Sequence, residues 1–169
     1  MASAELALGQ RLTMSAGKVD FISEAPLETI KAKCNLLQGI VDLETGTFAF
    51  SMNLTDFVGF NSDLQKEHFN ESYIESGIYP KSTFTGKLID KLDPKLLKQT
   101  VRAKGSLEMH GVKAERIIPV TITKAGNNYA FTTEFNVQIS DHGIKIPKIV
   151  HQKISEYVTI KVSGTLLNK

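Results

Sequence analysis

The sequence has few of the features that mark chemically specialised proteins. Its one cysteine, Cys34, excludes an intramolecular disulfide and a metal site built from several cysteines, and we expect it to be a small buried apolar residue. No run approaches the roughly 18 apolar residues that a membrane-spanning helix needs. The 20 basic and 18 acidic residues are spread along the chain, so no nucleic-acid partner is expected. The densest basic stretch, Lys145, Lys148 and Lys153, is interpreted as a solvated surface.

Motifs for catalysis or cofactor binding are also missing. There is no Gly-x-Ser-x-Gly nucleophile motif and no glycine-rich phosphate loop. His68 and Glu71 have an i, i+3 spacing that can bind a metal on a helix, but no second pair of ligands lies near them. Asp141-His142 could act as a general base, and a turn ending at Gly143 explains the pair equally well. We therefore predict no catalytic residue, no metal site and no cofactor.

The length and composition are those of one globular domain. A chain of 169 residues with 41% hydrophobic and 22% charged residues can bury a continuous core. No linker, repeat or low-complexity stretch divides it, so residues 11–169 are expected to form a single domain. Residues 1–10 are small and alanine-rich but lack a basic region and a full apolar region, so they are expected to be a signal-peptide remnant or a disordered terminus.

Alternation of apolar and polar residues is the dominant pattern. Phe48, Phe50, Met52 and Leu54 share one parity, and smaller or polar residues stand between them. This pattern places one side of a strand in an apolar interior and the other in water, which is typical of antiparallel sheets. The same alternation recurs in segments 11–14, 18–21, 83–88, 101–109, 120–123, 129–139 and 158–166.

Short turns separate these segments. Glu44-Thr45-Gly46 and the stretch 125–128 resemble hairpin turns, and His110-Gly111 links two further runs. His110 could alternatively meet a ligand's polar group, although a turn is the simpler interpretation. The count from residue 11 onward is about eight strands, without the alternation of strands and helices that indicates a parallel sheet.

One helix interrupts the strands. The stretch 62–74 begins with the capping candidates Ser62 and Asp63 and has acidic residues in its first turns. A second helical turn is also compatible with residues 26–31, because proline is accepted at the first position of a helix.

About eight long antiparallel strands and one helix predict an all-β closed barrel or a sandwich. A barrel of eight strands is just wide enough to be filled by side chains or to hold one small ligand. The inward positions are mostly large and apolar, but they include Gly86, Ala103, Gly105 and Gly164. These small residues either leave room for a ligand or mark bends in the barrel, and the sequence leaves both interpretations open.

Three stretches resemble the YceI-like family, the bacterial polyisoprenoid-binding, lipocalin-like proteins. They are residues 64–84 with Tyr79-Pro80, residues 103–113 with the His-Gly-Val turn, and residues 135–162 with Ser140-Asp141 before Gly-Ile. The stretches follow the family's order, and the resemblance covers about residues 18–167. The family often has an Arg-Asp pair where Gln65–Glu67 stand and an arginine where Gln138 and Ile139 stand. Because these residues are absent here, the sequence does not predict which polar head group the ligand carries.

The resemblance implies an eight-stranded antiparallel lipocalin-like barrel that carries an isoprenoid or fatty lipid without catalysis, as a monomer or homodimer. It also implies export to the periplasm or cell envelope, which favours a signal-peptide remnant at residues 1–10. The alternatives are a structural or protein-interaction barrel with a filled core, and a metal-dependent hydrolase. Phe69 and Tyr73 are candidates for a lid. The candidate tunnel-lining residues are Phe48, Phe50, Met52, Phe69, Phe84, Leu107, Met109, Ile122, Phe131, Phe135, Val137, Val158 and Ile160.

Overall fold

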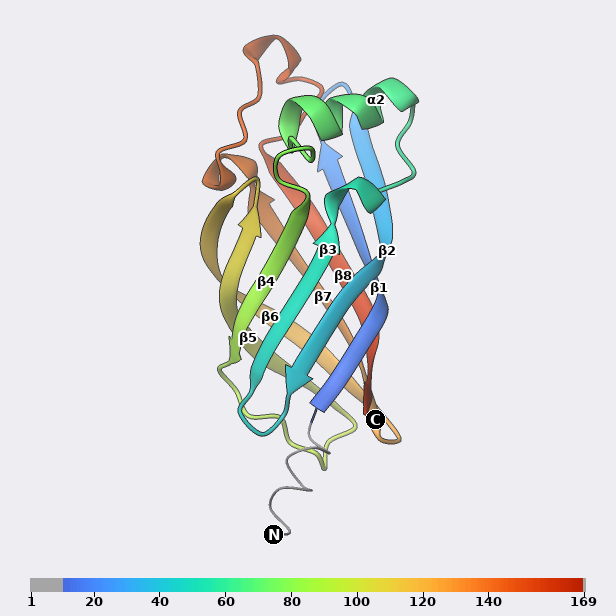
Figure 1. The fold of residues 1–169 in the computed structure, drawn as a ribbon, viewed down its shortest axis with the longest axis vertical. Helices are drawn as coiled ribbons and strands as arrows, with labels where there is room; N and C mark the ends of the chain where they lie inside the picture. The colour runs from blue at the N-terminus through green and yellow to red at the C-terminus, as the bar shows by residue number, and fades with distance from the viewer. Residues whose placement is uncertain (1–10, 169) are drawn as a thin grey trace.

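The computed structural model describes residues 11–168, and the expectations for residues 1–10 lie outside this range. Eight antiparallel strands follow one another around a closed barrel, and β8 pairs with β1 to complete it (Figure 1). The predicted fold class is therefore confirmed. The strands are β1 (Arg11–Glu24), β2 (Thr29–Asp42), β3 (Thr47–Asn53), β4 (Lys81–Leu88), β5 (Lys98–Met109), β6 (Val112–Ala125), β7 (Asn128–Gln138) and β8 (Tyr157–Asn168).

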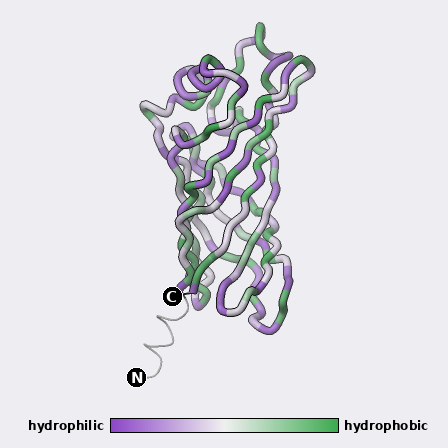
Figure 2. Tube along the Cα trace, turned by 90° about the vertical axis from the view of Figure 1, so that its right-hand side faces the viewer, coloured by the Kyte–Doolittle hydropathy of each residue, from purple (hydrophilic) through white to green (hydrophobic). Residues whose placement is uncertain are grey.

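Alternation along the strands produces the core. Hydrophobic and hydrophilic residues follow one another along the barrel wall in Figure 2. In β7, for example, Tyr129, Phe131 and Val137 are buried, whereas Thr132 and Glu134 between them are exposed. Cys34 is also fully buried, as the sequence predicts.

The eight predicted segments do not correspond one to one with the eight strands. Segments 11–14 and 18–21 are the two halves of β1, which is interrupted by a register shift between Met14 and Gly17. The shift moves the buried positions from even to odd residue numbers, so that one strand looks like two in the sequence. β2 was not among the segments, because its own alternation is broken where exposed Leu36 precedes buried Leu37.

The helix lies between β3 and β4. α2 (Asp63–His68) continues as a π-helical turn, η2 (Phe69–Tyr73), and the Ser62 hydroxyl caps it by accepting a hydrogen bond from the Gln65 amide at 3.1 Å. Figure 1 shows α2 across one end of the barrel. Short 3₁₀ turns complete the structure: η1 (Leu54–Asp56), η3 (Ile139–His142) and η4 (Lys148–Val150).

The second helical turn expected at residues 26–31 is wrong. Residues 25–28 form a tight hairpin turn in which the Ala25 amide donates to the Glu28 carbonyl oxygen at 3.0 Å, and β2 begins at Thr29. The fixed φ of Pro26 suits the second position of such a turn as well as it suits the first position of a helix.

Candidate binding cavity

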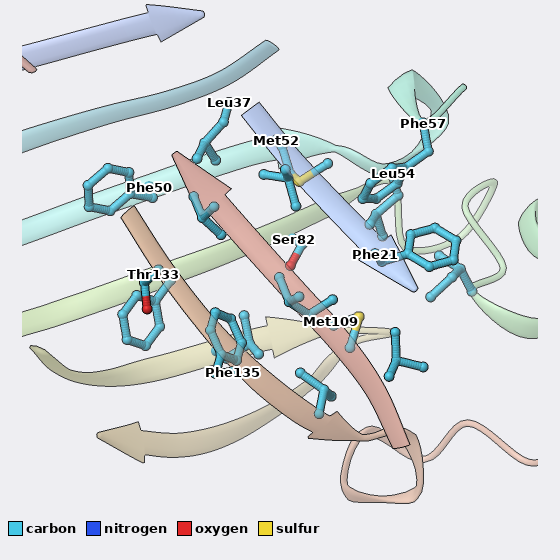
Figure 3. A pocket seen from close by; sticks show the side chains of 18 of the residues that line it. Phe21, Leu37, Phe50, Met52, Leu54, Phe57, Ser82, Met109, Thr133 and Phe135 are labelled. Carbon is cyan, nitrogen blue, oxygen red and sulfur yellow. The ribbon is translucent and has the colours of Figure 1, made fainter. Parts of the chain in front are cut away.

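An apolar cavity of about 550 Å³ runs through the barrel, and all eight strands contribute to its wall. Its volume is within the range of cavities that hold small ligands. Figure 3 shows Phe50 and Phe57 at opposite ends of the pictured wall, with Met52, Met109 and Phe135 between them. The cavity is therefore not filled by the side chains that form its wall.

All thirteen residues predicted to line a tunnel lie on the wall of this cavity. Their contact with a ligand stays a prediction. Further wall residues, which were not predicted, come from β1, which was predicted as two segments, and from β2, which was not predicted. These are Leu12, Val19 and Phe21 from β1, and Ile30, Leu37 and Val41 from β2.

The inward glycines do not create the space. A Cβ atom at Gly86 would overlap the backbone of β5 at Lys104 and Gly105. At Gly105 it would lie 2.9 Å from the Phe84 ring, and at Gly164 it would overlap Met14. These glycines therefore allow close approach of strands and side chains, and they do not leave room for a ligand. Ala103, in contrast, does lie on the cavity wall.

The mouth of the cavity is at the α2 end. Only five wall residues are exposed among those that the structure describes, and all belong to this end of the barrel: Asn61, Ser62, Leu64, His68 and Lys153. Wall residues at the opposite end are buried or half-buried, and Leu43 and Leu92 pack there against the core. We call these two ends the mouth and the closed end.

Polar groups on the wall are concentrated at the mouth. Glu28 and Gln65 join the exposed His68 and Lys153 there. Two hydroxyl groups deeper in the barrel, labelled in Figure 3, donate to the backbone. Ser82 donates to the Glu108 carbonyl at 2.9 Å, and Thr133 donates to the Pro119 carbonyl at 2.8 Å. The interior is therefore apolar in its chemistry as well as in its composition.

Aromatic contacts attach the helical segment to the wall. Phe69 stacks on Phe21 at 5.3 Å between ring centroids and also contacts Phe57 and Phe60 at 5.7 and 5.2 Å. Tyr73 lies on the cavity wall, where burial raises the pKa of its hydroxyl. α2 itself has no buried residue, so this short helix is held over the mouth mainly by the aromatic contacts of η2.

A hydrogen-bonded cluster links three connections at the mouth. His110 Nε2 lies 2.7 Å from the Glu75 carboxylate, and its Nδ1 lies 3.0 Å from the carbonyl oxygen of His142. Both partners are oxygen atoms that accept hydrogen bonds. Glu75 and His110 are also the two non-glycine residues in the range 11–168 with positive φ, at 54° and 56°. The predicted His110-Gly111 turn is confirmed, and His110 does not lie on the cavity wall.

His142 is a structural residue in this cluster. It is fully buried, its Nδ1 lies 2.9 Å from the Val112 carbonyl oxygen, and burial lowers its pKa. The turn predicted for Asp141-His142 before Gly143 is confirmed by η3, which ends at Gly143 with a φ of 69°. Its neighbour Asp141 is exposed, and neither residue lies on the cavity wall.

An arginine that the sequence analysis missed lies beside the same turn. β6 and β7 pair only between residues 121–125 and 128–132, and Arg116 bridges them where they separate, with Nη1 3.1 Å from the Asn136 carbonyl oxygen. Its Nη2 is 3.8 Å from Asp141. Arg116 of β6 is thus brought beside Asp141, a proximity that no sequence spacing reveals.

Within residues 11–168 no three His, Cys, Asp or Glu side chains are grouped as metal ligands would be, and this includes His68 and Glu71. No helix in the same range has the length and apolarity needed to cross a membrane.

A closed antiparallel barrel with an apolar interior open at one end is the architecture of small-ligand-binding barrels. The chain belongs to the family described as the YceI-like domain, whose model matches residues 11–166.

Solved structures show the same fold at low sequence identity. A polyisoprenoid-binding domain from Saccharophagus degradans is 12% identical, with a TM-score of 0.80 over 95% of this chain and 99% of that one. BcnA from Burkholderia cenocepacia is 15% identical, with a TM-score of 0.72 over 89% and 96% of the two chains. The YCEI protein of Campylobacter jejuni is 16% identical, with a TM-score of 0.59 over 76% and 77%. Comparison with curated proteins gave no significant match.

Proposed function

We propose that this protein binds and carries a long-chain apolar lipid, a polyisoprenoid or a similar chain, inside the barrel without catalysing a reaction. The observation that carries the proposal is the apolar cavity of about 550 Å³ with its polar mouth. Membership of the YceI-like family and the fold shared with a polyisoprenoid-binding domain support it. A structural or protein-interaction barrel with a filled core would not need this space.

The energetics favour an apolar tail. Each buried methylene contributes about 0.8 kcal/mol. A tail of about fifteen carbons therefore contributes on the order of 10 kcal/mol before the costs of association are subtracted. Tight binding needs no hydrogen bond deep in the barrel, in agreement with the backbone-directed hydroxyls of Ser82 and Thr133.

A polar head group would remain at the mouth, beside Gln65, His68 and Lys153. Phe69 and Tyr73 would act as the lid, because movement of the helical segment would separate Phe69 from Phe21 and widen the entrance. The resemblance to exported family members supports a periplasmic or cell-envelope location.

Native mass spectrometry of protein purified without detergent tests the proposal. We expect an additional species with the mass of a lipid, which organic solvent extracts. Ile160→Trp, on the wall in β8, should reduce this species about tenfold, because the larger ring occupies the cavity. Thr165→Trp, which is exposed on the same strand, is the matched control and should leave it unchanged. Repeated absence of any lipid, together with no thermal shift on adding apolar lipids, would refute carriage.

A further inference from the structure

The connection between β7 and β8 contains a basic segment, 143–155, which we call the rim loop. Asp141 and Glu156 flank it, and Asp141 lies 3.8 Å from Arg116. The rim loop contains Lys145, Lys148 and Lys153, all exposed, and no acidic residue. Figure 1 shows it rising above the barrel at the same end as α2. The three lysines that look sparse in the sequence therefore gather on one side of the mouth.

The rim loop has two apolar sides. Ile144, Val150 and Ile154 line the cavity, whereas Ile149 is directed outward and is 92% exposed, more than any other large hydrophobic residue described in the structure. Leu27 extends this outer surface, since it is 69% exposed and its amide donates to the Gln152 carbonyl at 2.7 Å.

The loop has a defined shape. His151 Nε2 lies 3.0 Å from the Ile146 carbonyl oxygen, and the Ile154 amide donates to the Val150 carbonyl at 3.0 Å. At its base the Ser155 amide donates to the Ser23 hydroxyl at 3.0 Å. The exposure of Ile149 is therefore a consequence of folded turns.

We infer that the rim loop and Leu27 form a docking surface for a membrane that contains anionic lipids. Apolar side chains surrounded by lysines insert into the interface of such a membrane while the ammonium groups contact the phosphates. The opposite side of the mouth is acidic, because α2 and η2 carry Asp63, Glu67 and Glu71 against Lys66. This asymmetry orients the barrel with the rim loop toward the lipid surface and the helix away from it.

The inference rests on the proposed function for its purpose, because a mouth held at the lipid surface allows an apolar chain to enter without crossing water. The docking geometry itself depends only on the rim. Binding to vesicles and binding of cargo are therefore measured separately.

Cosedimentation tests docking with vesicles of phosphatidylcholine alone and with vesicles that contain roughly a third phosphatidylglycerol. We expect binding to the anionic vesicles only, weakened by salt. Replacing Lys145, Lys148 and Lys153 with glutamine should weaken it on the order of 100-fold, since each lysine contributes about a factor of five. Ile149→Ser should weaken it about tenfold.

The closed end supplies matched controls. Lys91, Lys95 and Lys98 are exposed there, and so is Leu97 at 75%. Replacing the three lysines with glutamine, or Leu97 with serine, should leave vesicle binding unchanged. Equal loss in these controls, or no binding of the unaltered protein to anionic vesicles, would overturn the inference and leave the rim to a protein partner.

Cargo binding separates the two proposals. Binding of a fluorescent fatty-acid probe in vesicle-free solution should be unchanged in Ile149→Ser, because Ile149 does not lie on the cavity wall, and reduced by Ile160→Trp. Vesicle binding without probe binding would refute carriage and keep docking, and probe binding without vesicle binding would do the reverse.

Discussion

At the closed end the connection between β4 and β5 carries its charges as pairs or in balance, whereas the connection between β7 and β8 at the mouth carries three lysines against two acids, Asp141 and Glu156. Asp90 accepts two hydrogen bonds from the Arg102 side chain at 2.9 and 3.0 Å, and these bonds hold the pKa of Asp90 at about 2. Asp93 caps its own turn, and Lys124 donates to the Pro94 carbonyl at 2.8 Å. The connection is thus bound to the strands beside it.

The mouth uses different contacts. Its helix is attached by phenylalanine packing, and its turns are linked through His110. Wall residues are exposed here, and Leu64 is 58% exposed on α2 while Leu12 at the closed end is 1% exposed. The comparison indicates that the wall is buried at one end of the barrel and reaches the surface at the other.

Truncation of a leucine at each end should show the largest difference. Leu12→Ala is expected to lower the free energy of unfolding by about 3 kcal/mol, because it removes a fully buried side chain from the core. Leu64→Ala should change it by less than about 0.5 kcal/mol. Urea denaturation measures both, and equal losses would mean that the mouth is packed as tightly as the closed end.

Ion pairs at the two ends give a second comparison. Glu75→Ala should lower the free energy of unfolding by about 1 to 2 kcal/mol, since it removes a charged hydrogen bond to His110, whose side chain is 13% exposed. Asp90→Asn, in a pair open to solvent, should cost less. Thermal unfolding near neutral pH ranks the two variants, and the reverse order would contradict this assignment.

The smallest expected effect is a pH dependence at the mouth. His142 is buried and its pKa is lowered in the fold, so below about 6.5 the unfolded chain takes up a proton that the folded chain does not. Stability should therefore fall as the pH falls below this value, by at most about 1.4 kcal/mol for each pH unit. His142→Asn keeps a donor for Val112 and removes the titration. Denaturation of both proteins between neutral and mildly acidic pH measures the difference, and parallel curves would refute it.

The fold could be predicted from the sequence because six of the eight strands alternate over at least part of their length. The errors occurred where alternation changes phase. In β1 the shift after Met14 divides one strand into two segments, and in β2 the adjacent Leu36 and Leu37 hide the pattern. Alternation of apolar and polar residues indicates a strand only where the strand keeps its register with its neighbours.

The wall could be predicted for the same reason, and the mouth could not. Residues such as Phe135 and Val158 follow from parity alone. The exposed wall residues His68 and Lys153 lie outside the strands, and the placement of Arg116 beside Asp141 depends on how far β6 and β7 separate. Such positions are set by tertiary contacts, which leave no periodic signal.

The positive φ angles of Glu75 and His110 have a consequence for local opening. Each residue keeps an unfavourable φ, and the same 2.7 Å bond helps to hold both. Loss of this bond therefore releases the segment after η2 and the β5–β6 turn at once, and it also frees the ring that contacts η3. In hydrogen exchange, amides of these three connections should share one opening free energy, as a single cooperative unit smaller than the barrel.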